Sequence, residues 1–151
     1  MGAMEDKLAR MGLRLPPVHP YPSPNRIPCV QAGNILLPEG GVKLLDAEIA
    51  HVGDPAFDIG MLLAHALLPA AADGRAASLR ATVSRCWQAY AAEHAAAEPP
   101  ELTEALCYAG LELLRRTIGA ARVAAVADDE AGLRVIDVGI DLVRTGSLAG
   151  L

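Results

Sequence analysis

Aromatic side chains are scarce in this sequence, which has one Phe, one Trp and three Tyr among 151 residues. Hydrophobic residues still make up 52% of the chain, enough for a buried core in one domain of ordinary size. That core must be built mainly from Leu, Ile, Val and Ala, which favours closely packed helices over an aromatic-rich sandwich. We therefore expect a mainly α-helical protein.

Other scarcities exclude whole classes of protein. The cysteines Cys29, Cys86 and Cys107 are widely spaced and odd in number, unlike a disulfide framework or a paired metal motif, so we expect a reducing cytoplasm. The formal net charge is -5 and the basic residues are scattered, which argues against nucleic-acid binding. No apolar run reaches the roughly 18 residues of a membrane span, and the start does not resemble a signal peptide. We therefore expect neither nucleic acid nor membrane as a partner.

Proline is concentrated at the start of the chain. Such a density blocks the hydrogen bonding of both helices and central strands. The sequence therefore predicts a Pro-rich arm over residues 1–32, a helical domain over 33–147 and a short tail over 148–151. The prolines that define the arm are Pro16, Pro17, Pro20, Pro22, Pro24 and Pro28.

Two short apolar runs flank a turn in the middle third of the chain. Residues 34–37 and 42–46 are the runs, and residues 39–41 read Glu-Gly-Gly. Glycines between apolar runs are typical of a tight connection between antiparallel strands. We predict a small β-hairpin here.

Helix signals follow the hairpin. Asp54 suits an N-cap and Pro55 suits the first helical position, where its missing N–H costs nothing. We predict helices at 55–69, at 75–97 and from near 100 to 126. A fourth is expected to begin near Asp128.

Helical spacing also predicts which side chains of the last two helices face inward. Ile118 is expected on the apolar stripe of the third helix. The inward set of the fourth helix is expected to be Leu133, Ile136, Ile140 and Val143.

An Asn at the start of the hairpin and an Asp at its end are the side chains most suggestive of chemistry. A tight hairpin can bring Asn34 and Asp46 together, and neutral and anionic oxygen ligands suit Mg²⁺, which takes its other ligands from water and phosphates. The alternative is that Asn34 caps a turn and Asp46 ends a strand, both ordinary tasks for these residues.

Three motifs together carry a family resemblance. They are GNILL at 33–37, VKLLDAE at 42–48 and GDPAFDIG at 53–60. With their spacing, they resemble the aminoglycoside phosphotransferase and choline kinase superfamily, and methylthioribose kinases in particular. The resemblance covers residues of about 33–146. It implies the C-terminal lobe of a protein-kinase-like fold, ATP and Mg²⁺ as cofactors, and phosphate transfer to a small hydroxylated metabolite.

The resemblance also implies roles for four residues. Asn34 would be the metal-binding asparagine, and Asp46 the aspartate that holds Mg²⁺ against the nucleotide phosphates. Glu48 stands where the family often has a second acid near the metal or substrate. Asp58 matches a carboxylate that braces the catalytic loop. Its alternative role is an ordinary acid in the first turn of a helix, where the helix dipole favours it.

The sequence departs from the family in ways that bear on activity. Cys29 occupies the position of the catalytic Asp, and a thiol is no substitute for the carboxylate base. No Gly-rich phosphate loop and no strand with a nucleotide-pairing Lys precede Asn34, so we expect no N-terminal lobe and no activity of the chain alone. The alternatives are a non-catalytic assembly module and one piece of a split kinase. Loss of the lobe would expose apolar surface, so we expect self-association or a partner that supplies the lobe.

The arm has a resemblance of its own. Residues 8–17 and 25–36 resemble the opening of Rid-type enamine/imine deaminases. Arg26 stands where many members of that family have Tyr, and the rest of the family's sheet and its substrate-clamping Arg have no counterpart. The resemblance implies shared ancestry for the arm and no deaminase activity.

Overall fold

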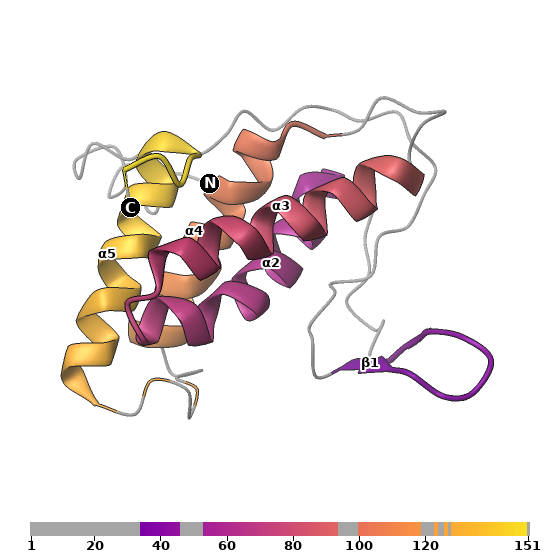
Figure 1. Ribbon diagram of the computed structural model, residues 1–151, viewed down its shortest axis with the longest axis horizontal. Coiled ribbons are helices and arrows are strands. Elements are labelled where there is room, and N and C mark those ends of the chain that lie inside the picture. The colour runs from indigo at the N-terminus through magenta and orange to yellow at the C-terminus, as the bar shows by residue number, and fades with distance from the viewer. Residues whose placement is uncertain are drawn as a thin grey trace.

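The structure of the chain is a computed structural model. It describes residues 34–45, 53–93, 100–118, 123, 126 and 128–150. In this part of the chain a two-stranded hairpin precedes four helices (Figure 1). The elements are β1 (Ile35–Leu36), β2 (Lys43–Leu44), α2 (Pro55–Ala72), α3 (Ala76–Glu93), α4 (Leu102–Ile118) and α5 (Asp129–Thr145). The expected fold class, mainly helical with one small hairpin, is confirmed.

The hairpin forms where the sequence predicts it. Its antiparallel register pairs Ile35 with Leu44 and Leu36 with Lys43. Gly40 and Gly41 in the turn have φ angles of 102° and 141°, which side-chain-bearing residues rarely adopt. The hairpin stands apart from the helices in Figure 1.

Helix α2 begins at the predicted cap. The Asp54 side chain accepts a hydrogen bond of 2.8 Å from the Ala56 N–H, and Pro55 takes the first helical position. The helix continues three residues beyond the predicted end, to Ala72, with Pro69 on its exposed side.

The core lies where α2, α4 and α5 meet. Helix α4 packs against both α2 and α5, whereas the main contact of α3 is with α2. Only Leu79 and Val83 of α3 are buried, so α3 covers the edge of the core. Leu148, in the predicted tail, is buried in the same core. The largest side chains excluded from solvent are Leu63, Leu67, Leu79, Leu113, Leu142 and Val135.

Glycines allow α4 to approach both neighbouring helices closely. A Cβ atom at Gly60 of α2 would lie 2.5 Å from the Cβ of Tyr108 and 2.7 Å from the Ala105 carbonyl oxygen. A Cβ atom at Gly110 of α4 would lie 2.6 Å from the Gly139 carbonyl oxygen. The backbones therefore touch at points where any side chain would hold them apart.

The predicted extent of the third helix is wrong. Helix α4 ends at Ile118, and neither Val123 nor Val126 is helical. Ile118 is 69% exposed and does not belong to the buried stripe. The apolar composition of residues 119–126 resembles that of a continuing helix, but Val126, which is not helical, is buried in the core.

The predicted inward face of the fourth helix is also partly wrong. Val143 is buried as predicted, but Leu133 is 61% exposed. The other buried apolar side chains of α5 are Ala131, Val135, Val138 and Leu142. The predicted set and the buried set both have helical spacing. The buried set lies on the side of α5 where Gly139 contacts α4. Close backbone contact therefore selects the face with smaller side chains.

Within the described ranges, one helix is long and apolar enough to cross a membrane by length and composition. This helix is α2, with 18 residues, and 61% of it is buried inside the molecule. Core helices of water-soluble proteins commonly meet the same two criteria.

Candidate functional site

The end of the hairpin carries the predicted metal ligand Asn34. Asn34 is half-buried, and its carbonyl oxygen accepts a hydrogen bond of 2.8 Å from the Leu45 N–H. This bond places Asn34 directly opposite the residue that precedes Asp46. Amide and carboxylate oxygens, the groups that Asn and Asp side chains carry, are ligands that suit Mg²⁺. Asp46 itself lies outside the described residues, as do Glu48 and Cys29.

Asp58 is buried in the first turn of α2 and only 5% exposed. A carboxylate at this position interacts favourably with the positive end of the helix dipole. The catalytic loop that Asp58 is expected to brace falls outside the described residues. The structure therefore agrees with the alternative role in the helix and leaves the bracing role as a prediction.

Tyr108 of α4 packs against the start of α2, and no motif or spacing in the sequence indicates this contact. Its ring meets the Phe57 ring edge-on, with centroids 5.5 Å apart and planes at 86°. Burial and the neighbouring Asp54 carboxylate raise the pKa of Tyr108 to about 12. The phenol is therefore protonated at neutral pH and helps to fix the segment that carries Asp58.

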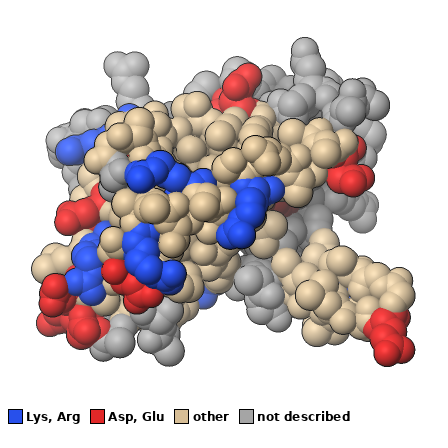
Figure 2. Space-filling model, in the orientation of Figure 1, with Lys and Arg blue, Asp and Glu red and all other residues tan. Residues whose placement is uncertain are grey.

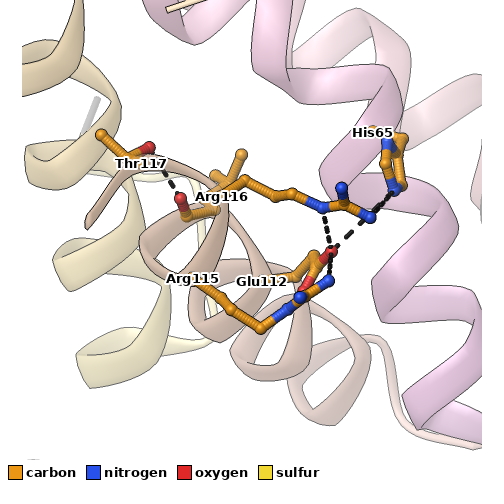
Figure 3. A network of polar contacts seen from close by, with 6 residues as sticks. His65, Glu112, Arg115, Arg116 and Thr117 are labelled. Atoms are coloured by element: carbon orange, nitrogen blue, oxygen red, sulfur yellow. Dashed lines mark hydrogen bonds and ion pairs between the residues drawn. The ribbon is translucent and has the colours of Figure 1, made fainter. Parts of the chain in front are cut away.

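A cluster of charged and polar side chains joins α4 to α2 (Figure 3). Its centre is Glu112, a buried carboxylate that is 3% exposed. Arg115 donates to it from Nε and Nη2, over 2.5 and 2.7 Å, and Arg116 donates from Nε over 2.7 Å. His65 of α2 completes the cluster, with Nε2 3.9 Å from Glu112 Oε1 and 3.4 Å from Arg116 Nη2.

The charges of this cluster determine its protonation states. Burial opposes ionisation of Glu112, but the hydrogen bonds and charges of Arg115 and Arg116 outweigh it and lower the pKa of the carboxyl. Burial, followed by the charge of Arg116, lowers the pKa of His65. The His65 ring is therefore neutral near pH 7, and the cluster carries one net positive charge. Arg115, 49% exposed, brings this charge to the surface.

Sequence reasoning overlooked the cluster as a unit. A Glu followed by Arg three and four positions later on a helix could have indicated it. The His65 side chain is 17% exposed and lies at the boundary of the core. Among the residues that the structure describes, no three His, Cys, Asp or Glu side chains are grouped so as to hold a metal ion.

The cluster predicts acid sensitivity. In the folded protein the pKa of His65 lies below its ordinary value of 6.5, and the pKa of Glu112 lies below its ordinary value of 4.5. At acidic pH the unfolded chain therefore binds more protons than the folded one. The contribution of each group to folding stability is complete above its ordinary pKa. It is lost as the pH falls through the lower pKa that the group has in the folded protein. The free energy of unfolding, measured with urea, should therefore decline below pH 6.5 and more steeply below pH 4.5. His65→Gln should remove the first decline, and an unchanged slope between pH 7 and 5 in this variant would refute the assignment.

The chain is similar to part of several methylthioribose kinases. It is 35% identical to that of Yersinia pseudotuberculosis, over 63% of this chain and 30% of the kinase. With that of Pectobacterium carotovorum it shares 33% identity, over 80% of this chain and 38% of the kinase. With that of Erwinia tasmaniensis it shares 32% identity, over 77% of this chain and 37% of the kinase. No protein-family profile and no solved structure matches the chain. The chain thus spans about a third of the length of the curated relatives it matches.

Proposed function

We propose that this chain forms the metal-binding, C-terminal part of an ATP-dependent phosphotransferase that acts on a hydroxyl group of a small metabolite. The observation that carries the proposal is its similarity to methylthioribose kinases at 32–35% identity. The hairpin supports it because its register brings Asn34 to the strand end from which Asp46 follows. The relatives' name suggests a thiosugar as the substrate.

In this function the oxygens of Asn34 and Asp46 would hold Mg²⁺, which neutralises phosphate charge during transfer. Glu48 would lie near the metal or substrate. Asp58 would position the loop before Asn34 from its buried place at the start of α2. Cys29, at the position of the catalytic base, would not accept the hydroxyl proton efficiently, and loss of a general base typically costs about 10²- to 10⁴-fold in rate.

The 151-residue chain alone is therefore expected to show no phosphate transfer from Mg²⁺·ATP to methylthioribose, choline or an aminoglycoside. Cys29→Asp alone should not restore transfer, because the chain corresponds to about a third of its relatives and nucleotide positioning needs more than a base. An enzyme-coupled assay for ADP measures phosphate transfer by the parent chain and by Cys29→Asp. Turnover above the blank that Asp46→Ala abolishes would show that the chain is sufficient.

Metal binding can be tested separately from turnover. Mn²⁺·ATP, a paramagnetic stand-in for Mg²⁺·ATP, should broaden the side-chain amide resonances of Asn34 in the full chain. Asp46→Asn should abolish the broadening, whereas Asp137→Asn, at an exposed position on α5, should preserve it. If Mn²⁺·ATP broadens no resonance of the hairpin, or broadens it equally in Asp46→Asn, the chain is better described as a non-catalytic assembly module.

A further inference from the structure

A cavity of about 490 Å³ lies among three helices at the edge of the core. Its walls come from the middle of α3, from the start of α4 and from the end of α5 with the residues just beyond it. Pockets that bind small molecules usually measure about 300–1,000 Å³. The cavity is therefore large enough for a small organic molecule.

The buried side chains that line the cavity are all apolar, and one wall is aromatic. Val83, Leu106 and Leu148 are the buried ones. Trp87 of α3 is half-buried and packs against the core, and its ring lies 5.5 Å from that of Tyr90. These contacts on two sides hold the indole in place. Such a lining suits a flat aromatic ring, because stacking adds to the energy of apolar burial.

The exposed edge of the cavity is polar and carries a positive charge. Arg80, Ser84, Gln88 and Thr103 line it, and Gln88 Nε2 donates a hydrogen bond of 3.1 Å to Ser84 Oγ. None of the described lining residues is acidic. Helix α4 begins at the cavity and α5 ends there, so the partial charges of the two helix termini oppose each other. Arg80 is therefore the formal charge that a ligand meets.

Helix α3 is basic along most of its length. Arg80 and Arg85 are its only charged residues before Glu93, which is the last residue of the helix. Figure 2 shows basic atoms across the middle of the face that α3 covers. A guanidinium group binds a carboxylate through two parallel hydrogen bonds. The cavity therefore favours a ligand with one negative group over a neutral or cationic one.

The cavity lies on the other side of α4 from the cluster in Figure 3. Leu106 lines the cavity, whereas Tyr108 and Glu112 contact side chains of α2. Tyr108 follows Leu106 by two positions, which is more than half a turn of an α-helix. The cavity is thus separate from the candidate site, and binding there does not depend on the proposed phosphotransferase function.

We propose that this cavity binds a flat aromatic carboxylate. The ring packs against Trp87 and the apolar side chains of Val83, Leu106 and Leu148, and the carboxylate pairs with Arg80 at the exposed edge. Because Arg80 is exposed, water weakens the ion pair. For a ligand of this size the dissociation constant is expected to be roughly 0.1–1 mM.

Nuclear magnetic resonance of the full ¹⁵N-labelled chain tests the proposal. Trp87 is the only Trp in the chain, so its side-chain N–H gives a single resonance that reports on the cavity wall. Indole-3-acetate, the probe, should shift this resonance in a saturable manner. Indole-3-ethanol has the same ring system but no charge, and it should bind about fivefold more weakly or less.

Two variants assign the charge that the probe recognises. Arg80→Gln should reduce the affinity for indole-3-acetate about fivefold and leave that for indole-3-ethanol unchanged. The matched control is Arg85→Gln, which removes an exposed charge of the same helix that does not line the cavity. Arg85→Gln should bind both probes like the parent chain. Circular dichroism should show equal helix content in all three proteins.

Three outcomes would overturn the proposal. The first is a Trp87 resonance that 5 mM indole-3-acetate does not shift. The second is equal affinity for the two probes, or no effect of Arg80→Gln, which would reduce the cavity to a weak apolar surface. The third is an equal loss of affinity in Arg85→Gln, which would indicate non-specific attraction to a basic helix.

Discussion

Glu112→Ala is expected to lower the free energy of unfolding by about 3 kcal/mol, because removal of one member of a buried ion pair leaves its partner charged and desolvated. The stranded group is Arg116, whose side chain is only 15% exposed and whose Nε has Glu112 as its ion-pair partner. Arg115 is half-exposed and can turn to water, so it contributes less to the loss. Urea denaturation near pH 7 measures the change.

Glu130→Ala provides the matched control. Glu130 also pairs with an Arg four residues later, over 2.8 Å to Arg134, but its side chain is 84% exposed. A pair of this kind in water contributes little, so the free energy of unfolding should change by less than about 0.5 kcal/mol. If Glu112→Ala and Glu130→Ala lower the free energy of unfolding equally, burial is not the reason for the contribution of the Glu112 cluster.

Gly110→Ala is expected to destabilise the protein by about 2–3 kcal/mol, although Ala is the better helix former. The added methyl group would lie 2.6 Å from the Gly139 carbonyl oxygen and 2.9 Å from the Leu142 Cβ. These neighbours belong to or adjoin the backbone of α5 and cannot rotate away, so the two helices must separate. Thermal or urea unfolding would register the loss.

Gly132→Ala separates this steric effect from helix propensity. Gly132 is also a buried helical glycine, but the nearest atom to its added methyl group would be Val126 Cγ1 at 3.4 Å, an ordinary contact. The substitution should be neutral or stabilise by up to about 1 kcal/mol. Destabilisation of Gly132→Ala to the same degree as Gly110→Ala would contradict the close approach at Gly139.

Local signals predicted much of the fold. The turn glycines at 40 and 41 determine the hairpin, and Asp54 with Pro55 determines the start of α2, because each acts through the conformation or hydrogen bonding of its own segment. Asp128 likewise caps α5 by accepting a hydrogen bond from the Ala131 N–H. Signals of this kind need no knowledge of neighbouring helices.

Features that depend on contact between helices were not predictable in the same way. The periodicity of α5 allowed two adjacent stripes, and the approach of Gly139 to Gly110 decides between them. The Glu112 cluster depends on His65, which is 47 positions earlier in the chain and reaches it only through the packing of α2 against α4. Of the predicted site, Asn34 and Asp58 have positions in the structure, and the roles of Asp46, Glu48 and Cys29 remain predictions.

The marginal attachment of α3 means that the molecule need not unfold as a single cooperative unit. With Leu79 and Val83 as its only buried side chains, α3 can detach at far lower cost than the separation of α2, α4 and α5. Such subglobal opening leaves the α2–α4 contact in place, including Tyr108 beside Asp54. Asp58, the member of the candidate site that α2 carries, therefore lies in the region that opens last.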